Sequence, residues 1–269
     1  MRCKVRVLLP LYITMVVALT APASAGEATS PEERGLAIAR EADRLSSGYG
    51  DSTANLRMVL RNREGLTSER ELRIRTLEVE GEGTRSLCIF DTPADVKGTI
   101  LLTHTHKQAD DDQWLFLPAT RRIRRIAAQN KSGSFMGSEF SYEDIAVQEL
   151  EKYTYRWLAD EPYDGNDCYV IERVPVDRVN SGYCRQVAWL DKEHYRTWKV
   201  DYYDRKNELL KTLTFKGYEK HLDRFWRARQ MEMVNHQTGK STFLTWSNLS
   251  FRTGLKEIDF DRHSLTLLR

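Results

Sequence analysis

The sequence has few cysteines, and their number excludes a disulfide-rich scaffold. Its 269 residues contain four, of which Cys88, Cys168 and Cys184 lie beyond residue 25. Three thiols cannot all pair within one chain. Cys168 and Cys184 lie on the two arms of one expected hairpin, so they can form a bridge. A turn near residues 177–182 would instead place Cys168 opposite a residue near Leu190, with the three cysteines as small, mostly buried side chains. Their spacing resembles no zinc site.

An excess of charge of one sign is also absent. The chain has 41 Lys and Arg against 39 Asp and Glu. Arg2, Lys4 and Arg6 are the only charged residues of the first 25, so 38 basic and 39 acidic side chains remain beyond them. Nucleic-acid binding needs a strongly basic surface. The composition therefore gives no support to a nucleic-acid partner.

Long apolar runs are missing beyond the N-terminus. No later stretch approaches the roughly 18 consecutive apolar residues that a membrane-spanning helix needs. The N-terminal run "VLLPLYITMVVALTAP" follows three basic residues and precedes Ala23-Ser24-Ala25, a small-residue cleavage signal. We predict a signal peptide over residues 1–25, cleaved after Ala25, and export of the mature protein. Cys3 precedes the apolar run and is not placed to accept a lipid.

Recognisable catalytic and metal-binding motifs are also missing. The sequence has no G-x-S-x-G elbow, no H-E-x-x-H and no phosphate-binding loop, which favours a protein without enzymatic activity. In "HTH", His104 and His106 would share one face of a strand, near Asp110, Asp111 and Asp112. These acids read as a turn, so we expect a polar surface there rather than a metal site, and no cofactor.

One helix and many strands are what the sequence does contain. Residues 31–45, "PEERGLAIAREADRL", have Ser30 as a cap, Pro31 in the first turn and an apolar stripe. The apolar period then changes to two, as in Leu56, Met58 and Leu60. Alternating patterns of this kind cover residues 54–63, 69–79, 85–91, 98–106, 113–118, 151–159, 168–176, 183–191, 195–204, 209–221, 225–236 and 240–251.

These patterns predict a mainly β fold of about 11 to 12 antiparallel strands, because helical patterns are nearly absent between them. We expect a single domain over residues 26–269, with one N-terminal helix. Such a sheet can close into a barrel or curl into an open half-barrel with helices across its concave side. In both cases the concave surface is the candidate site.

The one long interruption, residues 118–148, predicts a lid, a binding loop or an inserted helix. Gly133 and Gly137 flank Phe135 and Met136 within it. The strands also carry many aromatic side chains, which are either ordinary core or the walls of a cavity for an acyl chain. We single out Trp114, Phe116, Phe135 and Met136 as cavity or lid contacts.

The densest charge in the chain is "RRIRRI", residues 121–126. A guanidinium group can bind lipid head groups or an acidic protein partner in bidentate fashion. Internal ion pairs to residues 110–112 and 139–144 are the alternative. The residues proposed for head-group or partner contact are Arg121, Arg122, Arg124 and Arg125.

The central stretch resembles a known family. Residues 93–106, the run "DDDQWLFLPATRRIRRIAAQNKSGSFMGSEFSYEDI" and the later "DCYVIERVPV" are similar to bacterial periplasmic proteins called outer membrane lipoprotein-sorting proteins, related to LolA and LolB. The resemblance covers about residues 35–265. It implies an unclosed antiparallel β-barrel with helices over its open face, whose cavity holds acyl chains. It also implies a shuttle between inner and outer membranes, often associated with RND-type exporters.

Together these observations predict a non-enzymatic, monomeric periplasmic carrier of lipoprotein acyl chains or another lipid. Its partners would be an inner-membrane RND-type exporter or an outer-membrane acceptor. The chain lacks a lipid-accepting cysteine, unlike LolB, so it resembles a soluble carrier. The alternative is an interaction adaptor of an envelope transport complex without a lipid cargo. A hydrolase of envelope lipids is a third, weaker hypothesis.

Overall fold

The computed structural model describes residues 29–267, so the predicted signal peptide and its cleavage site lie outside the described residues. The described residues form one long helix, α1 (Pro31–Ser46), one four-residue helix, α2 (Tyr142–Ile145), and a single sheet of 13 strands. The strands are β1 (Asp51–Arg61), β2 (Thr67–Glu78), β3 (Thr84–Thr92), β4 (Ile100–His104), β5 (Asp112–Leu117), β6 (Arg122–Ile126), β7 (Tyr153–Tyr163), β8 (Asn166–Pro175), β9 (Tyr183–Asp191), β10 (Thr197–Asp204), β11 (Leu209–His221), β12 (Phe225–Asn235) and β13 (Ser241–Phe251).

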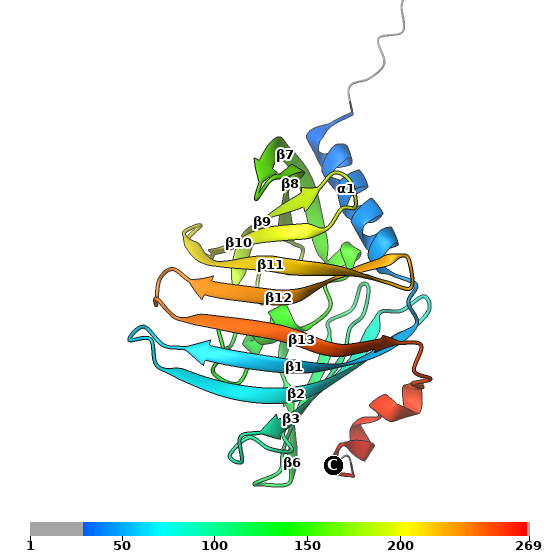
Figure 1. The fold of residues 1–269 in the computed structure, drawn as a ribbon, viewed down its shortest axis with the longest axis vertical. Coiled ribbons are helices and arrows are strands. Elements are labelled where there is room, and N and C mark those ends of the chain that lie inside the picture. Colours follow the sequence, from blue (N-terminus) through cyan, green and yellow to red (C-terminus); the bar gives the residue numbers. More distant parts are fainter. Residues whose placement is uncertain (1–28, 268–269) are drawn as a thin grey trace, which may run out of the picture.

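The sheet is antiparallel and unclosed. Its order is β6-β5-β4-β3-β2-β1-β13-β12-β11-β10-β9-β8-β7, so consecutive strands pair except β6 and β7, and β1 joins β13. Figure 1 shows the strands as a curved stack from β7 to β6, with α1 along one side. The predicted fold class is confirmed. The strand beyond the 12 expected is β6, whose arginines hide the strand pattern.

The two edge strands, β6 and β7, follow one another in the chain and are joined by residues 127–152, which we call the insert. The insert contains short helical turns, η1 (Ala128–Asn130), α2 (Tyr142–Ile145) and η2 (Leu150–Lys152). It lies behind the strands in the view of Figure 1. The interruption predicted over residues 118–148 therefore contains the strand β6, and the mostly irregular segment runs over residues 127–152 instead.

The helix α1 begins where the sequence predicted. The Ser30 hydroxyl accepts from the Glu33 N–H at 3.1 Å, and the Glu33 carboxylate accepts from the Ser30 N–H at 2.9 Å. This reciprocal cap satisfies two backbone N–H groups at the start of the helix that have no carbonyl partner within it. Gly35 packs directly on β7, where a Cβ would lie 2.5 Å from the Trp157 nitrogen. A larger residue there would push α1 off the sheet.

The main core lies on the face of the sheet covered by α1 and the insert, which we call the inner face. Alternate apolar residues of nearly every strand contribute to it, and Phe135 and Phe140 of the insert pack among them. The buried strand residues of this core are Leu56, Met58, Leu72, Ile74, Cys88, Phe90, Leu101, Leu115, Ile171, Tyr183, Ala188, Leu190, Val200, Tyr202, Leu213, Met233 and Leu244.

The outer face carries smaller clusters. One lies over β3–β5, where Leu87, Ile100 and Phe116 pack under Phe260 and Leu265. The latter two belong to the C-terminal turns η3 (Glu257–Phe260) and η4 (Arg262–Thr266), which the sequence patterns did not reveal. These strands are therefore buried on both faces.

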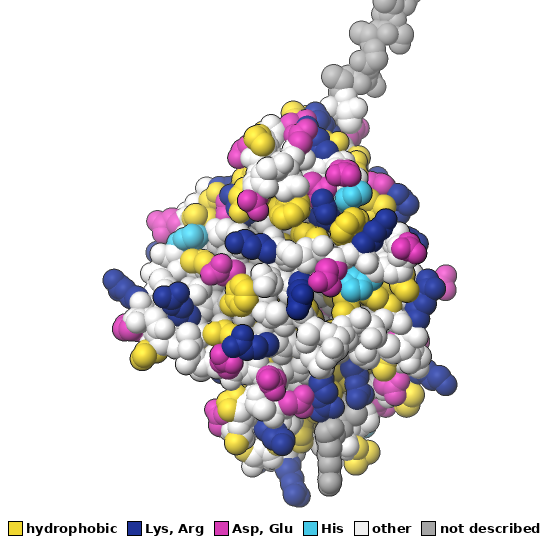
Figure 2. Space-filling view, viewed as in Figure 1, with side chains coloured by type: hydrophobic (Ala, Val, Ile, Leu, Met, Phe, Trp, Pro, Cys, Tyr) yellow, Lys and Arg dark blue, Asp and Glu magenta, His cyan; other side chains and the backbone are white. Residues whose placement is uncertain are grey.

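The surface carries mixed charge. Figure 2 shows acidic, basic and apolar side chains interspersed over the face in view, as expected from the near-neutral composition. Across residues 29–267, no helix has the length and apolar character to cross a membrane. Cys168 lies opposite Asp191, one residue beyond the expected Leu190, and Cys168 and Cys184 are both free.

Candidate functional site

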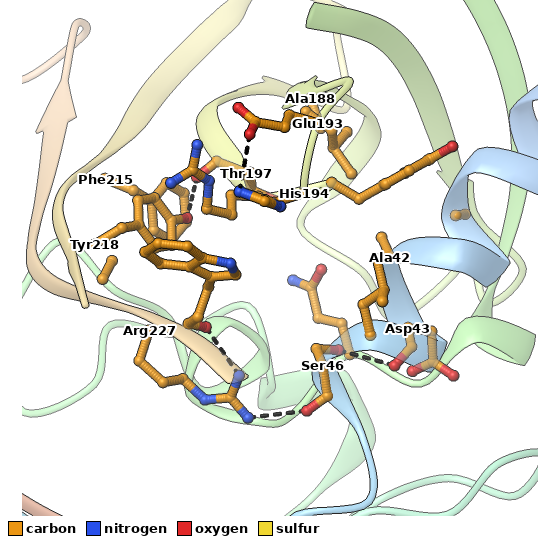
Figure 3. A pocket seen from close by; sticks show the side chains of 18 of the residues that line it. Ala42, Asp43, Ser46, Ala188, Glu193, His194, Thr197, Phe215, Tyr218 and Arg227 are labelled. Atoms are coloured by element: carbon orange, nitrogen blue, oxygen red, sulfur yellow. Dashed lines mark hydrogen bonds and ion pairs between the residues drawn. The ribbon is translucent and has the colours of Figure 1, made fainter. Parts of the chain in front are cut away.

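A cavity of about 580 Å³ lies between α1 and the inner face of the sheet. Its walls come from α1, from β7–β9, from the β9–β10 turn and from β11 and β12. Figure 3 shows Ala42 and Asp43 of α1 on one side and Phe215 and Tyr218 of β11 on the other. Small-molecule sites typically have volumes of about 300–1,000 Å³.

Much of the cavity wall is apolar. The side chains of α1 that contribute are small or aliphatic, and those of the sheet are aliphatic or aromatic. They are Ala39, Ala42, Leu45, Ile171, Ala188, Leu190, Phe215, Trp226, Ala228 and Met231. Burying one methylene group stabilises a complex by roughly 0.8 kcal/mol. The wall can thus hold an extended hydrocarbon chain without specific polar contacts.

The β9–β10 turn forms a polar rim. Asp191, 3% exposed at its side chain, pairs with Arg196 at 2.8 Å and accepts from the Trp198 indole at 3.0 Å. Burial acts to raise the pKa of Asp191, but the hydrogen bond from Arg196 and those from the His194 N–H and Trp198 outweigh it, so its pKa is below the ordinary value. The His194 ring stacks on Trp226, with centroids 5.0 Å apart.

Two arginines of the β11–β12 region hold the C-terminal end of α1. Arg227 donates to the Ser46 carbonyl at 2.9 Å, and Arg224 donates to the Arg44 and Ser47 carbonyls at 3.2 Å. Cations are favoured at this end of a helix because its last carbonyls carry partial negative charge. Burial lowers the pKa of Arg227. These contacts keep α1 across the cavity.

At the other end of α1, Arg34 pairs with Asp160 of β7 at 3.1 Å. The helix is therefore held by β7 near its N-terminal end and by the β11–β12 region at its C-terminal end. Next to β7, the Tyr155 hydroxyl donates to the Leu150 carbonyl at 3.2 Å, and burial raises the pKa of Tyr155 to about 12. The phenol thus stays neutral and acts as a donor in the wall.

A second, more polar cavity of about 600 Å³ lies between the insert and the ends of β9–β12. At its base, Lys211 of β11 pairs with Asp144 of the insert at 2.6 Å, and the two side chains are 5% and 2% exposed. The Tyr183 hydroxyl donates to Asp144 at 2.9 Å. Burial and the nearby Asp144 carboxylate raise the pKa of Tyr183 well above its ordinary value. This network ties the insert to the sheet.

The structure places Trp114 and Phe116 on the outer face, not in the inner cavity. Leu115 between them belongs to the inner core, so its neighbours on β5 point the other way. Phe116 packs in the cluster under the C-terminal turns, and Trp114 lies with its ring 5.1 Å from that of His104. Their role as ligand contacts stays a prediction, which this placement does not support.

Phe135 and Met136 lie on the inner side, as part of the insert. Phe135 is 1% exposed, and its ring lies 5.7 Å from that of Phe90. The Met136 carbonyl accepts from Arg70, and Met136 has a positive φ of 51°. Neither residue lines the cavity under α1. They fill the inner face beside it, and contact with a ligand stays a prediction for both.

The four arginines lie at or beside the exposed edge strand β6. Arg125 pairs with Asp112 at 2.5 Å, so one internal ion pair of the kind weighed above is present. Within residues 29–267, Arg121, Arg122 and Arg124 make no ion pair. A contact with head groups or a partner stays a prediction for all four.

The two histidines of "HTH" do not converge. His104 ends β4 with its Nε2 at 2.9 Å from the Phe260 carbonyl. His106 follows the strand and bonds to Glu82 and Asp112. In the described part of the chain, no group of His, Cys, Asp and Glu could hold a metal ion.

The residues that line the cavity were largely missed at the sequence level. Trp226, for example, was one of many strand aromatics, and Arg227 was not singled out. A usable signal was the helix itself, since the small residues Ala39 and Ala42 recur on the stripe that also carries Ile38. Small side chains on a buried helix face leave room between helix and sheet.

Comparisons with known proteins agree with this architecture. A family profile described only as an uncharacterized protein matches residues 82–266. A crystal structure from Vibrio parahaemolyticus, named as an outer membrane lipoprotein-sorting protein domain, is 53% identical, with a TM-score of 0.86 over 87% of this chain and 99% of that one. A DUF1329 family protein from Desulfovibrio piger is 35% identical, with a TM-score of 0.82 over 88% and 100%.

A more distant relative shares the fold alone. The LolA superfamily protein of known structure from Nitrosomonas europaea is 21% identical, with a TM-score of 0.69 over 85% of this chain and 98% of that one. No match was found among curated proteins.

Proposed function

Because the chain belongs to the family of outer membrane lipoprotein-sorting proteins, we propose that it is a periplasmic carrier of lipid. The cargo would be a lipoprotein acyl chain or another hydrophobic molecule, carried between the inner and outer membranes. The proposed step is binding and release, without catalysis.

The observation that supports this proposal is the cavity of about 580 Å³ under α1. One side is apolar, with side chains from α1 and from the strands β8, β9, β11 and β12. The rim is charged, with Arg196, Lys220 and Arg224 among its residues. An amphiphile needs this combination, since its chain must leave water while its polar end stays hydrated.

The arginines at β6 are the proposed contact with anionic head groups or with a partner protein. They lie on an exposed strand edge, and guanidinium groups suit phosphate and carboxylate partners. An inner-membrane RND-type exporter or an outer-membrane acceptor would be such a partner. The residues concerned are Arg121, Arg122, Arg124 and Arg125.

The test is lipid binding by protein purified gently from the periplasm. We expect native mass spectrometry to detect co-purifying lipid, and the emptied protein to take up a fluorescent fatty acyl probe. Ala42→Trp, which fills the cavity from α1, should lower probe affinity by about tenfold or more, because the apolar wall is then already occupied.

The matched control is Ala37→Trp, at an exposed position of the same helix, which should bind the probe like the native protein. Absence of both co-purifying lipid and probe uptake in the native protein would contradict the carrier function. Equal loss in the two variants would show that the cavity under α1 is not the binding site.

A second candidate is an adaptor without lipid cargo, in an envelope transport complex. The observation in its favour is that Phe135 and Phe140 of the insert already fill part of the inner face. Capture of a membrane exporter that persists in Ala42→Trp but is lost in Arg121→Glu/Arg122→Glu would support it.

A further inference from the structure

One charged side chain lies within the apolar wall of the cavity. Arg173 of β8 follows Ile171 by two residues, and both line the cavity from the inner face. Its neighbours in the sheet are Tyr155 on β7 and Gln186 on β9. A cation at this place needs an explanation, since the surrounding strands present apolar side chains.

Within the part of the chain that the structure describes, only one nitrogen of the Arg173 guanidinium has a hydrogen-bond acceptor. Its Nε donates to the Gln186 side-chain oxygen at 2.7 Å, and the group lies 5.4 Å from the centre of the Tyr153 ring. Among residues 29–267, its two terminal nitrogens find no acceptor and no carboxylate lies within 4.0 Å. In the described residues, Trp246 Nε1 is the one fully buried side-chain nitrogen or oxygen without a hydrogen-bond partner. The unpartnered terminal nitrogens of Arg173 are therefore not fully buried.

Two other cations of the inner side have anionic partners of their own. Lys211 pairs with Asp144 at 2.6 Å, and Arg196 pairs with Asp191 at 2.8 Å. Placing a charge in apolar surroundings is costly unless it is paired and hydrogen-bonded. Arg173 differs from them, because its terminal nitrogens have no partner within residues 29–267 and the residue lines the cavity.

From this contrast, and resting on the carrier function proposed above, we propose that the cavity selects an amphiphile with one acyl chain and an anionic group. The anionic group, a carboxylate or a phosphate, binds the free edge of the Arg173 guanidinium in bidentate fashion. The chain lies against the apolar wall between α1 and the sheet. A volume of about 580 Å³ suits one small ligand.

The experiment compares three probes that share a 16-carbon chain: palmitate, lysophosphatidylglycerol and the neutral monopalmitoylglycerol. Binding to delipidated full-length mature protein is measured by isothermal titration calorimetry below the micelle concentration of each probe. The native protein should bind the two anionic probes, or one of them, at least about tenfold tighter than the neutral probe.

Arg173→Met should remove this preference. It should weaken the anionic probes by about tenfold or more, because the charge-assisted hydrogen bonds are lost, and leave the neutral probe unchanged. Arg173→Lys keeps the charge and should retain part of the preference. The matched control is Arg185→Met on the outer face, where Arg185 pairs with Glu172 at 3.6 Å, and it should bind all probes like the native protein.

Tighter binding of palmitate alone would identify a carboxylate as the ligand group, and tighter binding of lysophosphatidylglycerol alone a phosphate. Equal affinity of the native protein for all three probes would overturn the inference and leave the carrier function intact. Binding of none of them would overturn both. If circular dichroism shows that Arg173→Met is unfolded, the probe preferences of the native protein and of Arg173→Lys decide.

Discussion

At the scale of single residues, burial determines how much the loss of one partner of an ion pair lowers stability. Lys211 and Asp144 are almost fully buried and tie the insert to β11. Arg57 and Glu69, by contrast, pair at 2.5 Å with side chains 50% and 54% exposed. Water and salt screen the exposed pair, whereas removing one partner of the buried pair leaves a desolvated charge.

Lys211→Met should therefore lower the free energy of unfolding by about 3–5 kcal/mol, because Asp144 loses its cation. The double variant Lys211→Met/Asp144→Leu should recover part of this loss. Arg57→Ala should cost no more than about 1 kcal/mol. Urea unfolding measures all three, and equal costs for Lys211→Met and Arg57→Ala would refute the structural role of the buried pair.

At the scale of elements, α1 covers part of the inner face of the open sheet and so forms the cavity. Its N-terminal half docks on β7 through Gly35 and Arg34, and its C-terminal end docks on β12 through Arg224 and Arg227. The helix could be predicted, because its cap and apolar stripe are local signals. Its anchors could not, since Arg224 and Arg227 lie some 180 residues away in the chain.

Arg224→Ala/Arg227→Ala should loosen the C-terminal turns of α1, because their carbonyls lose charge-assisted donors. We expect the amide protons of residues 40–47 to exchange about tenfold or more faster in hydrogen-exchange mass spectrometry. Arg229→Ala is the control, since Arg229 is exposed and pairs with Glu219 at 3.5 Å. Unchanged exchange in the double variant would mean that the sheet contacts alone hold the helix.

At the scale of the whole molecule, carboxylates that accept hydrogen bonds in the folded state make stability depend on pH. Burial acts to raise the pKa of Asp51, Asp177 and Asp191, but hydrogen bonds to each outweigh it, so each pKa is below the ordinary value. Their contribution to stability is present above the unfolded-state pKa, about 3.9. It is lost as pH falls below that value and through the lower folded pKa.

The native protein should thus lose stability in urea unfolding between about pH 5 and pH 3. Asp191→Asn should be less stable at pH 7, because Arg196 loses its partner, and its stability should fall less steeply over this range. Glu143 and Glu149, whose pKa burial raises, act in the opposite sense, so the comparison is between variant and native protein. An unchanged slope in Asp191→Asn would contradict the role of Asp191, and Asp110→Asn, at an exposed position, is the control.

The sequence by itself determined the elements. The period of two predicted the strands and their antiparallel pairing, because each hairpin is local. The capped amphipathic segment predicted α1. The near-neutral charge gave no support to a nucleic-acid partner. The edge strand β6 lies outside the alternating patterns, because its three arginines break the alternation that a half-buried strand shows.

Only the tertiary structure decided which face of each strand became the inner one. Strands β3–β5 are buried on both faces, so alternation could not tell that Leu115 faces inward and Trp114 and Phe116 face outward. The deciding contacts come from the C-terminal turns, which lie more than 140 residues further along the chain. The cavity also depends on the tertiary structure, because α1 lies opposite β11 and β12 only when the sheet is curled.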